Sequence, residues 1–406
     1  MTTQKVCGID VHRDTLVATI FDPKTQQKQT KTFRNSLDNI TQLVNWLKQN
    51  KCQKTAMEST NIYWMPLYET LEATNIEPIL ANAYQVKAIP GRKTDQSDSE
   101  WLAQLLQANL IKPSYVPPKQ IRILRKLVRL RIKYVQDRTQ CKNRVQKIFN
   151  SVNIRLRTVI SDIFGAAGTE IINGLLAEKT VDNILENTKN KQLKTKCDEI
   201  KAVAQGTLQQ EDIFMLNQLL RTIKCLDEQI KQIEQHIAVL VDKTAMDIVM
   251  SVPGVGFLSA ATILAELGEP SRFSNEKQVA SWCGLVPSLH QSAGVTTLGR
   301  ITKCGSKYLR WCMVEVAHGA VRVDCRFRVM FNRIAAKKGR KVAYVAVARK
   351  MLAVVWHLLV NGERYVDDGF LKKSVRVRLD GVVSVSFEDM IKTLRNAGFV
   401  VSKGLV

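Results

Sequence analysis

The sequence predicts an α/β domain at its start, followed by a mainly α-helical region. Short apolar strand patterns alternate with helical patterns up to about residue 117, and long helical patterns dominate after it. The 406 residues, 45% of them hydrophobic, are enough for more than one packed core. The formal net charge of +23 favours a polyanionic partner, most simply nucleic acid, over a surface charged only for solubility.

The first 117 residues have the order of a ribonuclease-H-like α/β domain. Three strand patterns of hairpin type come first, and strands and helices then alternate. In such a sheet the first and fourth strands are neighbours. Pro113, Pro117 and Pro118 mark the end of this domain. The predicted strands are 5–11, 15–21, 29–33, 54–59 and 77–81, and the predicted helices are 37–49, 63–73 and 95–108.

A basic helix and a coiled-coil region are predicted over 118–245. Residues 118–160 hold 13 basic side chains and one acidic side chain, mostly on one long helical pattern from 121 to 150. A strict heptad follows it, and it fits either a dimer seam or a helical hairpin made with the basic helix. Its a positions are Leu216, Ile223, Ile230 and Ile237, and its d positions are Leu219, Leu226, Ile233 and Leu240.

The remaining chain is predicted to form a mainly α domain over 246–360 and an extension over 361–406. The turn at 252–256 between two helical patterns is typical of a helix-hairpin-helix element, in which Gly254 and Gly256 let backbone N–H groups reach a phosphate. A plain helix turn is the alternative. Apolar runs are interrupted by charges, and the nine cysteines are scattered, so we expect a cytoplasmic, nucleoid-associated protein without a membrane partner.

Four acidic residues stand out by their surroundings. Asp10 lies within an apolar strand and Glu58 ends another, which places them side by side at one sheet edge if the strands are neighbours. Asp95 and Asp98 begin a helix, three residues apart and on one face, where a helix cap is the alternative reading. Four carboxylates in one pocket need a counter-charge, and Mg²⁺ prefers such ligands. Two ions per site could clamp a phosphodiester.

The motifs around these residues resemble those of the IS110 family of transposases and its Piv-type invertase relatives. The amino-terminal motifs are Gly8-Ile9-Asp10-Val11, Met57-Glu58-Ser59-Thr60 and Lys93-Thr94-Asp95-Gln96-Ser97-Asp98. The carboxy-terminal ones are Val252-Pro253-Gly254-Val255-Gly256, Arg272-Phe273-Ser274, Gly284-Leu285-Val286-Pro287 and Gln291-Ser292-Ala293-Gly294. The resemblance covers roughly residues 5–155 and 245–355.

The resemblance implies a RuvC-like nuclease domain with a DEDD motif, a coiled-coil region and a transposase domain with a nucleophilic serine. The matching serine is Ser292, which the sequence places in a loop. The serine would attack a DNA phosphodiester and hold the strand covalently, with Mg²⁺ at the DEDD residues. Double-stranded donor and target DNA, a structured non-coding guide RNA and a dimer or tetramer are implied as partners.

Basic side chains, together with the two glycines of the turn at 252–256, are the predicted contacts to nucleic-acid phosphates. For the basic side chains the alternative is a helix face that only contacts solvent. The predicted nucleic-acid-binding residues are Arg122, Arg125, Lys126, Arg129, Lys133, Gly254, Gly256, Arg300, Lys303, Lys307 and Arg310.

Three other functions stay open. They are a Piv-like site-specific invertase, a metal-dependent nuclease of the Holliday-junction type without serine chemistry, and a non-catalytic nucleic-acid scaffold.

Overall fold

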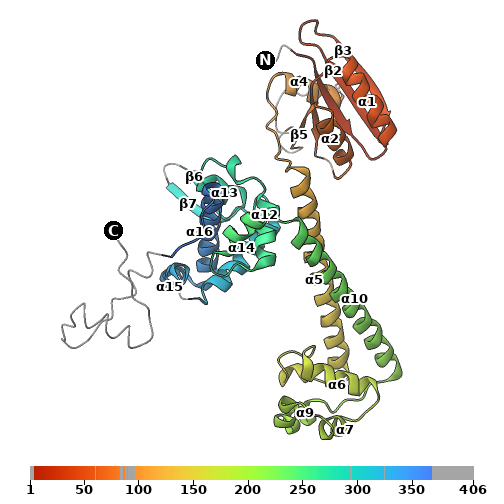
Figure 1. Ribbon diagram of the computed structural model, residues 1–406, viewed down its shortest axis with the longest axis vertical. Coiled ribbons are helices and arrows are strands. Elements are labelled where there is room, and N and C mark those ends of the chain that lie inside the picture. Colours follow the sequence, from red (N-terminus) through yellow and green to blue (C-terminus); the bar gives the residue numbers. More distant parts are fainter. Residues whose placement is uncertain are drawn as a thin grey trace, which may run out of the picture. The chain divides into compact units, whose positions relative to one another are not determined.

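The computed structural model describes residues 4–59, 61–82, 86, 89, 97–292, 295–323 and 325–367 (Figure 1). The chain divides into two compact units, Met1–Pro118 and Lys119–Val406. The first contains a five-stranded sheet with helices, and the second is mainly helical. This confirms the predicted outline of an α/β domain followed by a helical region.

The sheet of the first unit has the strand order β3-β2-β1-β4-β5. The first three strands form an antiparallel meander, while β4 pairs parallel to β1 and β5 parallel to β4. The predicted neighbourhood of the first and fourth strands is therefore confirmed. The bounds are β1 (Val6–Val11), β2 (Thr15–Phe21), β3 (Lys28–Arg34), β4 (Lys54–Glu58) and β5 (Glu77–Ala81).

Helices cover both faces of this sheet. The face that carries Cys7, Ile9 and Val11 packs against α1 (Leu37–Gln49) and α2 (Trp64–Ala73). The opposite face packs Val6 and Ala56 against α4 (Asp98–Gln107). Side chains alternate between the faces along a strand, so Gly8 and Asp10 belong to the face under α4.

Two long helices form an antiparallel hairpin in the second unit: α5 (Lys119–Ser151) and α10 (Gln210–Leu240). Arg131 pairs with Glu234 and Arg138 with Asp227, which fixes the antiparallel direction. The a positions of the heptad are buried within this chain, while the d positions are half-buried or, at Leu240, exposed. The structure thus contains the helical hairpin, one of the two readings that the heptad left open.

The helix α5 takes part in two separate hydrophobic cores. Its first half contributes Leu124, Val128 and Ile132 to the core of the later helices, and its second half contributes Val145 and Phe149 to a smaller core. The smaller core contains η1 (Leu156–Thr158), α6 (Ala166–Leu176), α7 (Val181–Glu186), α8 (Lys191–Thr195) and α9 (Cys197–Val203).

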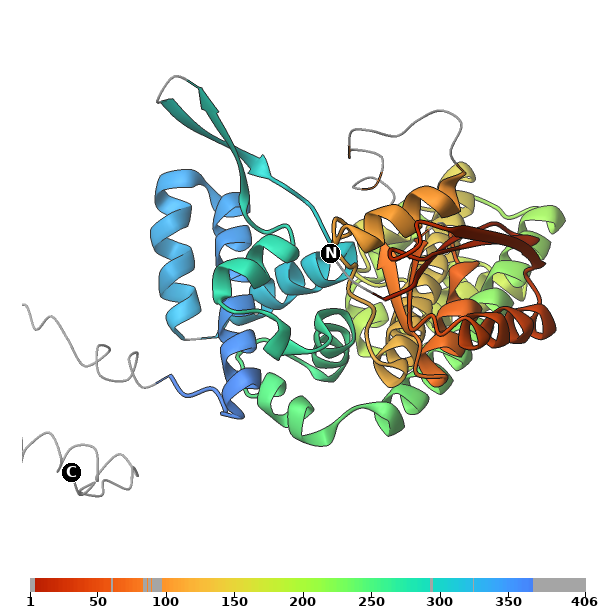
Figure 2. The same cartoon turned by 90° about the horizontal axis from the view of Figure 1, so that it is seen from above.

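The larger core joins the first half of α5 to the helices of the carboxy-terminal part. Its elements are α11 (Lys243–Met250), α12 (Phe257–Leu267), η2 (Pro270–Arg272), α13 (Glu276–Trp282), α14 (Lys307–Ala320), α15 (Arg326–Lys338) and α16 (Arg340–Asn361). A two-stranded hairpin, β6 (Pro287–Ser292) and β7 (Val295–Ile301), projects from these helices (Figure 2).

One helix differs from the expectation that no apolar run is long enough to cross a membrane. By length and composition α16 passes that test. Its residues Val347, Met351 and Val355 are fully buried in the larger core, as expected for the central helix of a globular unit. The apolar composition of α16 is therefore accounted for by the residues that it contributes to the larger core.

Candidate functional site

Asp10 and Glu58 end two neighbouring parallel strands. The register pairs Ile9 with Met57, so the next residues along the two strands, Asp10 and Glu58, lie side by side at the carboxyl end of the sheet. Both follow small residues, Gly8 and Ala56, by two positions and so belong to the face under α4. The predicted convergence of these two carboxylates thus has its basis in strand pairing.

The helix α4 approaches this face unusually closely because Gly8 has no side chain. A Cβ atom at Gly8 would lie 2.0 Å from the carbonyl oxygen of Ser99 and 2.4 Å from the backbone nitrogen of Ala103. The buried Ser99 hydroxyl lies 2.8 Å from that of Thr19 on β2. A bare glycine and one buried hydrogen bond therefore seat the start of α4 beside the strand that carries Asp10.

Asp10 is half-buried and has a histidine partner. Its Oδ2 lies 3.0 Å from Nε2 of His12, and the two side chains are 23% and 61% exposed respectively. His12 is thus an exposed residue that also contacts the carboxylate. The imidazole reaches the carboxylate from the turn that follows β1.

Asp98 is the first residue of α4 and is exposed. The cap of this helix is Ser97, whose hydroxyl accepts a hydrogen bond from the backbone N–H of Glu100 at 3.3 Å. Asp95 lies outside the described residues. Within the described ranges no group of three or more histidine, cysteine or acidic residues is close enough to hold a metal ion. Asp10 and Glu58 nevertheless lie side by side at the ends of their strands and carry the oxygen ligands that hard divalent cations prefer.

Ser292 lies at the end of a strand, which corrects its predicted place in a loop. It is the last residue of β6 and pairs with Val295 across the hairpin. The segment alternates apolar and polar residues only over 287–290, and polar residues and glycines then follow, so the strand pattern in the sequence is weak at Ser292. Residues 293 and 294, which include the Ala293 of the serine motif, lie outside the described residues.

The predicted phosphate contacts divide into exposed and internally engaged residues. Lys126, Lys133, Arg300, Lys303 and Lys307 are exposed. Arg122, which the sequence places among the phosphate contacts, is only 6% exposed. Arg125, Arg129 and Arg310 make hydrogen bonds within the second unit.

The arginines of α5 converge on a buried carboxylate that sequence reasoning missed. Glu266 on α12 is 1% exposed, and its two oxygens accept hydrogen bonds from Arg129 at 2.6 and 2.8 Å. The hydroxyl of Ser306 donates to the same carboxylate at 2.7 Å. These bonds from Glu266 raise the pKa of Arg129. An acidic residue in the Ala-rich run 257–267 was the available signal, as it was for Asp10.

Gly254 and Gly256 flank the turn between α11 and α12. Gly254 has a φ of +82°, and a Cβ there would lie 2.4 Å from the backbone nitrogen of Ala320 on α14. Gly254 is therefore explained by close packing of the turn on α14. Gly256 caps α12, and no atom lies within 4 Å of where its Cβ would be. A phosphate contact at these glycines stays a prediction.

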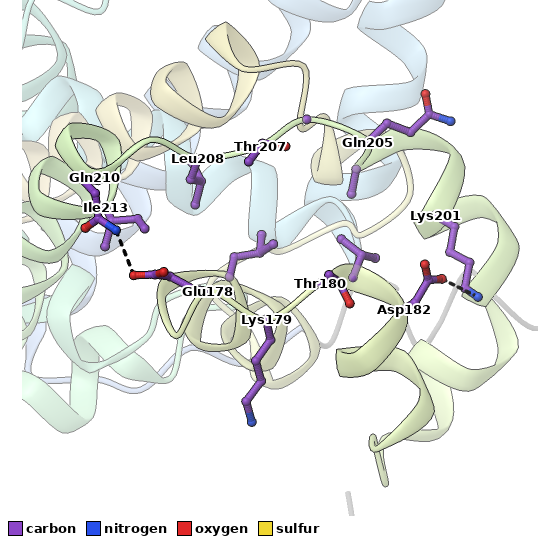
Figure 3. A pocket seen from close by; sticks show the side chains of 14 residues that line it. Glu178, Lys179, Thr180, Asp182, Lys201, Gln205, Thr207, Leu208, Gln210 and Ile213 are labelled. Atoms are coloured by element: carbon purple, nitrogen blue, oxygen red, sulfur yellow. Dashed lines mark hydrogen bonds and ion pairs between the residues drawn. The ribbon is translucent and has the colours of Figure 1, made fainter.

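A pocket lies at the far end of the α5–α10 hairpin, in the smaller core (Figure 3). Its volume is about 550 Å³, and none of the predicted site residues lines it. Among its charged side chains, Lys201 pairs with Asp182 at 2.7 Å, and Glu178 with Gln210 at 3.0 Å. The pocket therefore contains none of the residues proposed for catalysis or nucleic-acid binding.

The acidic sheet edge and the helical region with its serine hairpin both match known transposases. Residues 7–154 match a family model for DEDD transposases, and residues 246–331 match the model described as the transposase IS116/IS110/IS902 family. The chain belongs to the IS110 family of transposases.

Individual relatives agree with this family. A probable family 20 transposase of Pseudomonas aeruginosa is 32% identical over 151 residues, covering 36% of this chain and 44% of that protein. A putative transposase, y4pF/y4sB, of Sinorhizobium fredii is 26% identical over 320 residues, covering 75% and 71%. The transposase for insertion sequence element IS1111A of Coxiella burnetii is 28% identical over 170 residues, covering 39% and 47%. The first and third alignments thus span less than half of those relatives.

Proposed function

We propose that this protein is a DNA transposase that cuts and rejoins strands through a covalent bond between Ser292 and DNA. The observation that supports it most is the pairing of β1 with β4, which sets Asp10 beside Glu58 on the face of the sheet that α4 covers. A ribonuclease-H-like, RuvC-like fold for the first unit fits the strand order. The family membership adds the serine motif in the second unit.

The acidic residues are proposed as the ligands of two Mg²⁺ ions: Asp10, Glu58, Asp95 and Asp98. Bound there, the ions would lower the barrier to phosphoryl transfer by stabilising charge on the attacking and leaving oxygens. His12 donates to Asp10 when its Nε2 carries the proton, and so holds that carboxylate in one orientation. Asp98 is the first residue of α4, the helix that packs closely on Gly8 of the strand that carries Asp10.

The serine step conserves the number of phosphodiester bonds. The Ser292 oxygen loses its proton and forms a bond to phosphorus, the bond from phosphorus to a sugar oxygen breaks, and the freed sugar oxygen takes up one proton to become a hydroxyl. The reverse attack by a sugar hydroxyl on the serine ester rejoins DNA and restores the serine. A serine hydroxyl needs activation for this attack, and the proposed acidic centre would supply it.

The partners are proposed from the same family membership. Double-stranded donor and target DNA would contact the exposed basic residues, a structured non-coding RNA would select the sites, and a dimer or tetramer would complete the active centre with a serine from another subunit. We expect the protein to act in the cytoplasm, on the nucleoid. The terminal extension, residues 361–406, is given no role.

A nicked suicide substrate tests the serine proposal. Wild type should form a protein–DNA adduct that survives denaturation, and Ser292→Ala should form none. Ser288→Ala is the matched control because Ser288 lies on the same strand, β6. Cleavage without an adduct in wild type would instead favour a metal-dependent nuclease of the Holliday-junction type. Inversion of the segment between two repeats, without insertion elsewhere, would favour the Piv-like invertase.

The acidic centre is tested with Asp10→Asn and Glu58→Gln in Mg²⁺. Each should lower strand cleavage by roughly a hundredfold or more, because each removes a ligand charge from the reacting phosphate. Asp14→Asn is the control, since Asp14 is an exposed carboxylate in the turn beside His12. Cleavage that is unchanged in the Asp10 and Glu58 variants would exclude the metal proposal. Binding without any cleavage in wild type would instead leave a non-catalytic scaffold as the function.

A further inference from the structure

The β6–β7 hairpin is closed at its base by direct backbone contact. The N–H of Thr302 donates to the carbonyl of Val286 at 2.9 Å, and that of Lys303 to the carbonyl of Gly284 at 3.2 Å. At Gly284, with a φ of +70°, a Cβ would lie 2.4 Å from the carbonyl oxygen of Cys304. The two chain segments at the base are therefore too close for a side chain to separate them.

Arg310 bridges these two segments from the first half of α14. Its Nη1 donates to the carbonyl oxygen of Cys283 at 3.0 Å and to that of Cys304 at 3.0 Å. Cys283 precedes β6, and Cys304 follows β7. One guanidinium nitrogen thus joins the strand that leads toward Ser292 to the strand that returns from it.

The helix that carries Arg310 is itself fixed at its start. Ser306 caps α14 by accepting from the N–H of Leu309 at 3.2 Å, and its hydroxyl donates to the buried Glu266. Glu266 is held by Arg129 of α5. Arg310 therefore holds the hairpin base from a helix that hydrogen bonds anchor to α12 and α5.

We propose that Arg310 is a positioning residue that sets the direction in which the strand bearing Ser292 leaves the helical core. Sequence reasoning placed Arg310 among the phosphate contacts, and the two carbonyl bonds give it a different role. The inference rests on the proposed chemistry of Ser292, because misdirecting a nucleophile by about 1 Å can lower a rate about a hundredfold. We call the two bonds from Arg310 to the carbonyls of Cys283 and Cys304 the clamp. Hydrogen exchange at the hairpin base measures the clamp without any reaction.

The charge-keeping variant Arg310→Lys separates the two roles. A lysine satisfies a phosphate as a point charge, but its nitrogen ends one bond short of the arginine Nη1. We expect Arg310→Lys and Arg310→Gln to speed hydrogen exchange at the amides of Thr302 and Lys303. We expect adduct formation on the suicide substrate to slow by roughly tenfold to a hundredfold, with DNA affinity and its salt dependence unchanged.

Arg300→Ala is the matched control, because Arg300 is an exposed cation on β7 of the same hairpin. It should lower the slope of log affinity against log salt by about one while leaving the amide protection intact. The clamp would be disproved if Arg310→Lys showed the amide exchange rates of wild type at Thr302 and Lys303 and formed the DNA adduct at the wild-type rate. It would also be disproved if Arg310→Gln only lowered the salt slope, as a phosphate contact would.

Failure of the inference is distinguishable from failure of the proposed function. An adduct that persists in Ser292→Ala would disprove the serine chemistry, and the exchange measurement would still test whether Arg310 holds the hairpin base. Unchanged amide exchange in both Arg310 variants, together with loss of the adduct in Ser292→Ala, would leave the proposed function in place and remove the clamp. If Arg310→Gln does not fold, Arg310→Lys alone carries both measurements.

Discussion

Gly8 decides how near α4 comes to the acidic edge of the sheet. The helix backbone occupies the space where any side chain at this position would begin. Ser99 then uses its buried hydroxyl, 2.8 Å from that of Thr19, to fasten the first turn of α4 to β2. These two small residues therefore set the distance between α4 and the strands that carry Asp10 and Glu58.

Replacing Gly8 by alanine should separate α4 from the sheet. A methyl group 2.0 Å from the Ser99 oxygen forces a backbone shift, and we expect the free energy of unfolding of the first unit to fall by about 1–3 kcal/mol. Urea unfolding measures it. Gly256→Ala, which adds a methyl group into open space, should cost no more than about 1 kcal/mol as a cap change. Equal losses for the two variants would contradict this account of Gly8.

Buried thiols predict a loss of stability at alkaline pH. Burial raises the pKa of Cys52 to about 11 and that of Cys283 to about 12. Between the unfolded thiol pKa of about 8.5 and these values, the unfolded chain releases a proton that the folded chain keeps. Stability from these thiols is therefore complete below pH 8.5 and falls as the pH rises toward 11 or 12.

The pH effect is measured by urea unfolding at pH 8 and pH 10.5. The fall in unfolding free energy over this range should be smaller in Cys52→Ala than in wild type. Cys225→Ala is the control, since Cys225 is exposed and should leave the fall unchanged. A Cys52→Ala variant with the pH dependence of wild type would show that this thiol does not contribute.

At the scale of elements, the α5–α10 hairpin and its attachment to α12 organise the second unit. The a positions of α10 are buried against α5, whereas Glu266 fastens the first half of α5 to α12 and α14. A carboxylate removed from water must be compensated fully, and here two arginine nitrogens and one hydroxyl do so.

Removing the Glu266 carboxylate should cost more than removing an exposed one. Glu266→Ala leaves Arg129 without its anion in a half-buried place, and we expect a loss of roughly 2–4 kcal/mol in unfolding free energy. Glu234→Ala breaks the more exposed pair with Arg131 and should cost about 1 kcal/mol or less. Similar losses in thermal or urea unfolding would argue against a special role for Glu266.

The heptad predicts a matching contrast on α10. Ile230→Ala removes a side chain that is 5% exposed and should lower the unfolding free energy by about 2–5 kcal/mol. Val239→Ala, on the same helix but 82% exposed, should change it by no more than about 0.5 kcal/mol. Equal effects would mean that the hairpin is not the packing that stabilises this helix.

Helices and strands were predicted correctly from the sequence where the hydrophobic periodicity of one segment was strong. The helix at 37–49 and the strand at 77–81 lie where hydrophobic periodicity placed them, and the heptad marked the buried face of α10. The sequence-based prediction failed at β6–β7, where glycines beside Ser292 suggested a loop. Pairing with the next strand of the hairpin, which the side-chain pattern of β6 alone does not reveal, decides that segment.

The site was predictable in its carboxylates and less so in its surroundings. An acidic residue inside an apolar strand revealed Asp10, and strand order then placed Glu58 beside it. The sequence did not predict the partners of Arg129 and Arg310. Arg129 contacts Glu266, which is more than a hundred residues away along the chain, and Arg310 contacts backbone carbonyls, which every residue has. Composition cannot separate a cation that meets phosphate from one that meets a buried acid.

For the whole molecule, the net charge of +23 has to be divided by what each cation contacts. The cations engaged within the second unit stabilise the fold, and the exposed ones remain for a polyanion. DNA affinity should therefore depend on salt less steeply than the full count of basic residues suggests.

A salt titration of DNA binding tests this division. Lys126→Ala and Lys307→Ala should each lower the slope of log affinity against log salt by about one, because both residues are exposed. Arg129→Ala should leave the slope unchanged and reduce stability instead. A slope that falls equally in all three variants would place Arg129 among the phosphate contacts after all.

The sharing of α5 between two cores makes its middle a spacer of adjustable length. Between Ile132 and Cys141 the helix belongs to neither hydrophobic cluster, and the ion pair of Arg138 with Asp227 bridges this stretch to α10. Adding seven residues to α5 and seven to α10 in this stretch would move the smaller core, with η1 and α6–α9, about 10 Å farther from the larger one. Every side chain in both cores would keep its neighbours. The distance between the two cores would then follow from the length of the two helices and not from the side chains packed in either core.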